Sequence, residues 1–398
     1  MPVVEASPEV RLNVDVLAAP APTPTSSKLR NLMPWVTIVG FLGSLLLLAY
    51  GTFVREQPTF EQERARHPYP PFPTKRYEME DGPRWTEMAL MDHLGYRDML
   101  MKANRQVHLG VFGEPGSNFT WIGTNDWLYL NVSDPNRGHF DKPALDERLT
   151  IWAVAYAERA KWCRDNGMEF VVLLAPEKSS VYPEYLTEQQ RRSLPVVEVP
   201  TRMKELLQAH GVRCIDPLPA LLEAKSDSSV YFRNDTHWNQ AGALVGERLL
   251  MKELGSTASE DYTVEFHETT GDLNRLTSNT QTCTAPFYTH NHRKPVWNLA
   301  HASRELLPPK ARPKHLPPKV STNPHATGPS LVLLHDSFGE NMFDFLYHDC
   351  KSVATAASDN FEIDYILAHR PQVVVQEIVM RKLYRWIPSQ PPAWQSPR

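Results

Sequence analysis

The prediction of the fold begins with the stretch Leu331-Val332-Leu333-Leu334-His335-Asp336-Ser337-Phe338-Gly339. Its first four residues are apolar, and a short apolar run of this kind is typical of a strand that is buried on both faces. A polar segment and a glycine follow, where such a strand would end. In open sheets of alternating strands and helices, functional residues lie at the carboxyl ends of the strands. We therefore expect Ser337 to lie at the functional edge of a sheet.

The sequence on either side alternates between predicted strands and predicted helices. Two of the helices should end at Gly167 and Gly211, because glycine is common just past a helix C-terminus. The predicted strands are 170–174, 212–215, 331–334 and 373–378, and the predicted helices are 149–166, 201–210 and 239–254, with further helical character over 85–111. This alternation is typical of βαβ units. We predict an α/β fold with a mostly parallel sheet flanked by helices.

A second segment, Tyr231-Phe232-Arg233-Asn234-Asp235-Thr236-His237-Trp238-Asn239, places a carboxylate two residues before a histidine. A hydroxyl becomes a good nucleophile when a base takes its proton and a third group fixes the tautomer of that base. Ser337, His237 and Asp235 are the residue types for these three roles. The alternatives are a helix cap at Asp235 with His237 on the surface, or a metal site. A mononuclear metal site needs three or more protein ligands, so we expect neither metal nor cofactor.

Together the two segments resemble the SGNH hydrolase-like domain of the alginate O-acetyltransferases AlgJ and AlgX. In that family an Asp-x-His-Trp segment precedes an Asp-Ser-Phe segment. Other stretches are similar to the family in the same order, namely Gly123–Tyr129, Leu174–Lys178, Val181–Leu186, Gly271–Leu273 and Glu377–Arg381. The resemblance spans Trp121 to Lys382. Asp126 and His335 depart from the pattern, because the family usually has glycine at both positions.

The resemblance implies an SGNH-hydrolase-like acyltransferase with a Ser-His-Asp triad. Ser337 would attack the acyl donor, His237 would act as base and Asp235 would orient His237. The backbone N–H of Ser337, at a helix start, is expected to stabilise the oxyanion. The residues expected to contact substrate are Lys178, Tyr182, Trp238 and Arg381. For Arg381, an ion pair with Glu377 is the alternative.

The function expected from this resemblance is O-acetylation of an exported polysaccharide, which accepts the acetyl group from an acyl-serine intermediate. A carbohydrate acetylesterase would use the same triad with water as the acceptor. A non-catalytic exopolysaccharide-binding or assembly subunit is the third possibility, and a distorted triad would point to it. The resemblance also implies a partner, a membrane-bound O-acyltransferase that supplies the acyl donor.

The N-terminal part of the sequence predicts a membrane anchor. Met33–Val54 is a run of 22 residues without a charged side chain, and roughly 20 apolar residues span a bilayer. A disordered tail is expected over 1–32 and an extended Pro-rich tether over 55–84. We predict an uncleaved signal anchor in the inner (cell) membrane, with a cleaved signal peptide as the alternative. The flanking charges do not decide its orientation. The resemblance places the catalytic domain in the periplasm.

Composition and length limit the remaining possibilities. The SGNH-hydrolase-like domain is expected over 85–385, with a Pro-rich loop at 305–330 and a C-terminal tail at 386–398. Lys and Arg number 42 against 46 Asp and Glu and form no long basic run, which excludes a nucleic-acid partner. Four cysteines allow three disulfide schemes, which stay open: Cys163, Cys214, Cys283 and Cys350.

Overall fold

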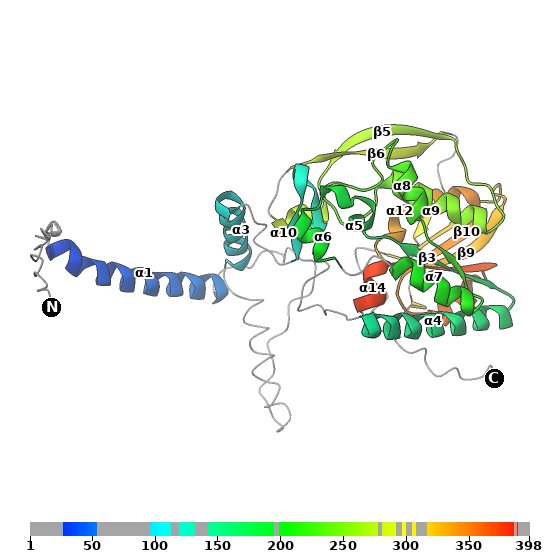
Figure 1. Cartoon of the computed structure of the whole chain (residues 1–398), viewed down its shortest axis with the longest axis horizontal. Coiled ribbons are helices and arrows are strands. Elements are labelled where there is room, and N and C mark those ends of the chain that lie inside the picture. The colour runs from blue at the N-terminus through cyan, green and yellow to red at the C-terminus, as the bar shows by residue number, and fades with distance from the viewer. Residues whose placement is uncertain are drawn as a thin grey trace, which may run out of the picture. The chain divides into compact units, whose positions relative to one another are not determined.

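The computed structural model describes residues 27–53, 96–112, 119–131, 142–194, 199–277, 281–291, 297–299, 305–307, 317–385 and 388 (Figure 1). The chain divides into two units, residues 1–101 and 102–398. The first unit contains helix α1 (Ser27–Phe53). Its 19-residue segment Pro34–Thr52 is long and apolar enough to cross a membrane. Its large apolar side chains are exposed. The predicted anchor is therefore helical, and the helix begins at Ser27 rather than Met33.

A seven-stranded mixed sheet forms the centre of the second unit (Figure 1). Its order is β4-β3-β11-β9-β10-β8-β7; the first five strands are parallel, and β8 and β7 are antiparallel to their neighbours. The strands are β3 (Glu169–Ala175), β4 (Arg213–Ile215), β7 (Trp297–Leu299), β8 (Lys319–Thr322), β9 (Gly328–His335), β10 (Cys350–Ala357) and β11 (Val373–Val379). The predicted α/β class with a mostly parallel sheet is confirmed.

Helices cover both faces of this sheet because alternate residues of its central strands are apolar on both sides. Leu331 and Leu333 of β9 pack into one core, and Val332 and Leu334 pack into the other. The first core includes α8 (Leu218–Ala224), α9 (Gln240–Glu253) and α12 (Gly339–Asp349); the second includes α4 (Lys142–Asp165), α7 (Val199–Ala209), α13 (Ile363–His369) and α14 (Met380–Arg385). Full burial of each such Val or Leu contributes roughly 1.5–3 kcal/mol.

Most of the predicted elements are present with small changes at their ends. The strands predicted at 170–174, 212–215, 331–334 and 373–378 correspond to β3, β4, β9 and β11. The helices predicted at 149–166, 201–210 and 239–254 correspond to α4, α7 and α9. Gly167 and Gly211 have φ angles of +73° and +67°, the left-handed conformation that ends a helix. Of the helical segment expected over 85–111, the structure describes α3 (Arg97–Val107) and the π-helical turn η1 (His108–Phe112).

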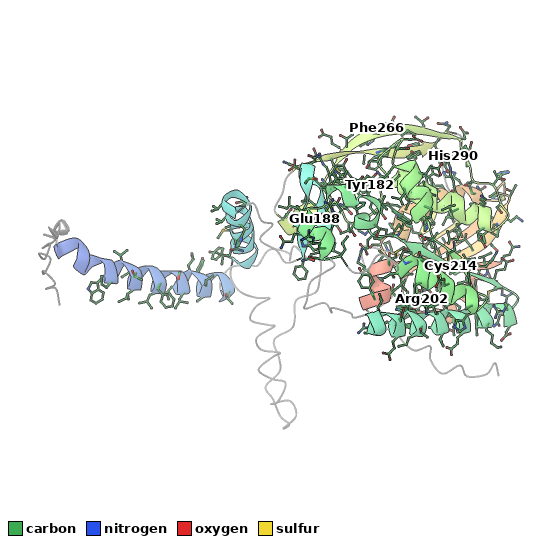
Figure 2. The ribbon with its side chains drawn as sticks, viewed as in Figure 1. Tyr182, Glu188, Arg202, Cys214, Phe266 and His290 are labelled. Atoms are coloured by element: carbon green, nitrogen blue, oxygen red, sulfur yellow. The ribbon has the colours of Figure 1, made fainter. Side chains whose placement is uncertain are left out.

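Two antiparallel hairpins were not predicted. They are formed by β1 (Thr120–Ile122) with β2 (Leu128–Leu130), and by β5 (Tyr262–Thr269) with β6 (Cys283–His290). β5 has no buried face, and its Phe266 is 66% exposed (Figure 2). The run Tyr262-Thr263-Val264-Glu265-Phe266-His267 alternates apolar and polar residues, so the pattern of a strand was present but was not recognised. The shorter helical elements are η2 (Thr124–Asp126), α5 (Lys178–Val181), η4 (Pro183–Tyr185), α6 (Glu188–Arg192) and α10 (Asp272–Thr277).

The Pro-rich segment 305–330 is not one exposed loop, and that prediction is wrong in part. Residues 319–322 form β8, which pairs with β10, and β9 already begins at Gly328. The run Val320-Ser321-Thr322 favours a strand, and Ser321 is buried. The four cysteines are unpaired, three of them buried. The predicted N-terminal tail to residue 26, the tether 55–84 and most of the C-terminal tail lie outside the described residues.

Candidate active site

Three side chains from distant parts of the sequence meet beyond the carboxyl end of β9. The Nε2 atom of His237 lies 2.7 Å from Oγ of Ser337, and its Nδ1 atom lies 2.6 Å from Oδ1 of Asp235. Nδ1 can therefore donate to the carboxylate while Nε2 accepts the serine proton, which is the tautomer that a general base needs. The side chains of His237 and Asp235 are 21% and 18% exposed. The geometry brings together all three residues predicted for the triad.

A tight turn before α9 places Asp235 beside His237. Tyr231 and Trp238 pair across this turn, and Oδ1 of Asp235 also accepts the backbone N–H of His237 at 2.9 Å. Asn239 caps α9 by accepting the N–H of Gly242 at 3.1 Å. The alternative in which Asp235 caps this helix is therefore wrong. The carboxylate is left free to orient the imidazole.

Lys178, the first residue of α5, makes hydrogen bonds to the backbone of this turn. Its Nζ atom donates to the backbone carbonyls of Phe232 and Arg233, each at 3.1 Å, and of Asp235 at 2.5 Å. Burial lowers the pKa of Lys178 to about 7, against the opposing charges of Asp235 and Asp272. Lys178 is 3% exposed and its donors point to the main chain. The prediction that it contacts substrate is therefore wrong, and its contacts make it a support for the turn.

Lys178→Met should lower the free energy of unfolding by about 2–4 kcal/mol, because three backbone carbonyls lose their donor. Chemical denaturation measures this change, with Lys252→Met on the exposed face of α9 as the control. Because folding lowers the pKa of Lys178, the unfolded chain binds more protons between pH 7 and 10.5. The wild type should therefore gain stability over the variant as pH rises through this range. Equal unfolding curves for Lys178→Met and the wild type would contradict the supporting role.

Trp238 and Tyr182 are also structural, and the prediction that they contact substrate is wrong. Trp238 is fully buried, and its Nε1 atom donates to the backbone carbonyl of Phe338 at 2.9 Å. In return, the Nδ2 atom of Asn341 donates to the carbonyl of Trp238 at 3.0 Å. The Tyr182 side chain is 5% exposed, and its hydroxyl accepts the N–H of Val230 (Figure 2). Trp238 thus joins the turn that carries His237 to the segment Phe338–Asn341. Tyr182 contacts the backbone that leads into this turn at Val230.

Arg381 pairs with Glu177 rather than with Glu377. Its Nη1 atom lies 3.1 Å from both carboxylate oxygens of Glu177. The guanidinium lies 5.3 Å from the centre of the Phe338 ring, which in turn packs 4.9 Å from the ring of His237. The Arg381 side chain is 12% exposed. Arg381 thus stays a candidate for substrate contact near the triad.

The turn that carries Ser337 is held by two buried carboxyl groups. Asp336 accepts the N–H of Phe338 and of Val379, both at 2.9 Å. Oε2 of Glu377 accepts the N–H of Asp336 at 3.0 Å and of Gly339 at 3.1 Å. The N–H of Ser337 is left without a partner among the residues that the structure describes. It is therefore available to an oxyanion.

His335, where the family usually has glycine, does not displace Ser337 from His237. Its ring is buried, and Nδ1 lies 2.6 Å from the backbone oxygen of Asp336. Gly339 makes room for it, because a Cβ at residue 339 would lie 2.4 Å from Cβ of His335. Ser337 still reaches His237, as the distance of 2.7 Å between Oγ and Nε2 shows.

The electrostatics of the site raise the pKa of His237 and lower the pKa of Asp235, so they stabilise the imidazolium that forms when His237 takes a proton. Burial lowers the pKa of His237, but the hydrogen bond to Asp235 and the charges of Asp235 and Asp272 together raise it above its ordinary value of 6.5. For Asp235 burial raises the pKa, yet the bond and charge of His237 and two backbone N–H donors lower it overall. Such opposite shifts are typical of an acid–base pair.

Asp272, at the start of α10, is the member of the site to which the sequence assigned no role. Its only signal was the similarity of Gly271–Leu273 to the family. The side chains of Asp235, His237 and Asp272 offer atoms within 4.8 Å of one another, a spacing that also suits a metal ion. However, all four carboxylate oxygens accept hydrogen bonds from Thr236, His237 or the Asp272 N–H. This pattern fits a hydrogen-bonded triad better than a metal site.

Comparisons with known proteins agree with the sequence motifs. Residues 121–315 match the family model of the SGNH hydrolase-like domain of acetyltransferase AlgX. The match includes Asp235 and His237 and ends before Ser337. Probable alginate O-acetylase AlgJ of Azotobacter vinelandii is 30% identical over 135 residues, 34% of this chain and 33% of that protein. Its counterpart in Pseudomonas aeruginosa is 28% identical over 148 residues, 36% of this chain and 34% of that protein.

The aligned segment therefore covers about a third of the length of these curated relatives. Among solved structures, the O-acetyltransferase domain of Pseudomonas putida AlgJ has a TM-score of 0.47 and 15% identity, covering 67% of this chain and 93% of that one. Bacillus cereus PatB1 has a TM-score of 0.47 and 17% identity, covering 66% and 97%. The resemblance to the AlgJ and AlgX family is confirmed by the family model and the curated relatives.

Proposed function

We propose, from the match of residues 121–315 to the SGNH hydrolase-like domain of acetyltransferase AlgX, that this chain is an O-acetyltransferase acting on an exported polysaccharide. The observation that carries the proposal is the position of His237, within 2.7 Å of Ser337 and 2.6 Å of Asp235. The polysaccharide acceptor is taken from the names of the relatives, which are probable alginate O-acetylases.

The proposed reaction has two steps that use the same base. Oγ of Ser337 attacks the carbonyl carbon of the acyl donor, and its proton passes to Nε2 of His237. The donor's leaving group takes that proton, and an acyl-serine remains. A sugar hydroxyl then gives its proton to His237 and attacks the acyl carbon. Oγ of Ser337 departs as the new ester forms and recovers the proton from His237.

Three groups support this chemistry around the reacting atoms. Asp235 stabilises the imidazolium that forms in each step. The N–H of Ser337 would donate to the oxyanion, a contribution typically worth about 2.7–4 kcal/mol per donor. Arg381 is the proposed substrate contact, because its guanidinium lies over Phe338 beside the imidazole.

A carbohydrate acetylesterase is the second candidate, since the same triad transfers the acyl group to water. A non-catalytic binding or assembly subunit is less well supported, because both contacts of His237 are within hydrogen-bonding distance. The purified full-length chain, incubated with an acetyl ester and a polysaccharide, separates these candidates. Acetylated polymer supports the transferase. Acetate release alone favours the esterase, and neither product would favour the binding subunit.

We also propose that Met33–Val54 is an uncleaved single-pass anchor in the inner membrane, with the catalytic domain in the periplasm. A membrane-bound O-acyltransferase partner would supply the acyl donor there. Alkaline-phosphatase fusions made after Pro83 should be active, and a cytoplasmic reporter at the same point should be inactive. The opposite pattern would overturn the location and the exported acceptor together.

A further inference from the structure

The carboxylate of Asp272 lies beside the imidazole of His237 at the nitrogen that does not face Ser337. Its Oδ2 atom is 3.9 Å from Nδ1 of His237. The hydroxyl of Thr236 bridges the two groups, since it donates to Oδ2 of Asp272 at 2.6 Å and lies 3.1 Å from Nδ1. The base thus has two carboxylates on its Nδ1 side, one in direct contact and one through a hydroxyl.

Asp272 also makes hydrogen bonds to the backbone and to the carboxylate of Asp235 in the turn that carries His237. Its N–H donates to Oδ2 of Asp235 at 2.8 Å, and its Oδ1 atom accepts the N–H of Thr236 at 2.8 Å. The preceding Gly271 permits this approach, because a Cβ there would lie 2.0 Å from the backbone oxygen of Asn234. A side chain at this position would push the two segments apart.

We propose that Asp272 is a positioning residue of the active site, which orients Asp235 and Thr236 around His237 and favours the imidazolium by its negative charge. The inference rests on the proposed function, since the imidazolium forms only if His237 takes the serine proton. Asp272 acts through its neighbours and has no contact with Ser337.

The charged groups that face this carboxylate predict a signature in the pH profile. Asp235 and His237 on the turn and Lys178 on α5 interact with Asp272 itself, and Arg381 on α14 acts on His237. Burial and Asp235 raise the pKa of Asp272, and Asp272 in turn helps to raise the pKa of His237, whereas Arg381 lowers it. Because neutral His237 is the active base, removing the charge of Asp272 should move the rise of activity to lower pH.

The test is Asp272→Asn, which keeps the shape of the side chain and removes its charge. We expect kcat to fall roughly tenfold to a hundredfold with KM unchanged, since misplaced catalytic groups cost factors of this size. The low-pH limb of kcat/KM and the NMR titration of the His237 ring should both move to lower pH. Asp272→Glu, which restores the charge, should move both back. Asp364→Asn, on the exposed start of α13, is the charge control and should change neither.

A purely structural role would slow the enzyme without moving the titration of His237, so an unmoved titration in folded Asp272→Asn overturns the inference. Thr236→Val removes only the bridging hydroxyl and keeps the charge. It should lower kcat and leave the low-pH limb nearly in place, and an unchanged kcat would also count against the inference. If Ser337→Ala retains activity, the proposed function fails, while the NMR titration still decides whether Asp272 acts on His237.

Discussion

Replacing Ser337 with alanine is expected to abolish acyl transfer and to leave the fold intact. The hydroxyl is partly exposed, and its hydrogen-bond partner among the described residues is Nε2 of His237 at 2.7 Å. Its loss therefore costs little packing, while the reaction loses its nucleophile. Removal of one triad member lowers turnover by a factor on the order of 10⁴ or more. Turnover of an acetyl ester and the mass of the acetylated protein both measure the loss of acyl transfer.

Ser193→Ala, at the exposed end of α6, is the matched control and should behave as the wild type. The melting temperature of Ser337→Ala should also match the wild type. Equal ester turnover in Ser337→Ala and wild type would remove Ser337 from the mechanism. No turnover in either protein would instead favour the binding or assembly subunit.

Asp235→Asn should lower kcat/KM by a factor on the order of 10⁴, because the amide of asparagine donates to Nδ1 and stabilises the wrong tautomer of His237. The effect should exceed that of Asp272→Asn, since Asp235 contacts Nδ1 directly at 2.6 Å. Ester turnover over a range of pH values measures both the rate and its low-pH limb.

The sign of the pH dependence follows from the charge on His237. Its pKa is raised above 6.5 in the folded protein, so kcat/KM of the wild type should rise through a pKa higher than 6.5. Burial alone lowers that pKa, so the residual activity of Asp235→Asn should appear at lower pH. Asp227→Asn, on the surface after α8, is the control. A wild-type rate in Asp235→Asn would leave His237 and Ser337 to act without a third group.

The sequence predicts the centre of this fold because its central strands are unusual. β3, β9 and β11 each contain a short apolar run, which is typical of buried strands between parallel neighbours. Gly167 and Gly211 mark helix ends by a backbone conformation that other residues rarely adopt. The residues of the proposed triad could also be chosen from the sequence, since two short motifs supply all three residue types.

The remaining features depend on contacts that no local pattern reveals. Lys178 has the residue type of a substrate contact, but its ammonium group donates to three main-chain carbonyls. Arg381 pairs with Glu177, which is 204 residues away in the chain, rather than with nearby Glu377. β8 lies within a Pro-rich segment and is identified by its pairing with β10. Each of these arrangements is decided by tertiary partners.

The hydrogen bonds between Trp238 and the segment Phe338–Asn341 join parts of the chain about a hundred residues apart. Such contacts form only after the long loop between them has closed, at a cost in chain entropy. Until they form, Ser337 has no base beside it and has the low reactivity of any free serine hydroxyl. An incompletely folded molecule would therefore not take up acyl groups. Under the proposed mechanism, completion of the fold activates Ser337, so the chain would become competent for acyl transfer only once it is fully folded.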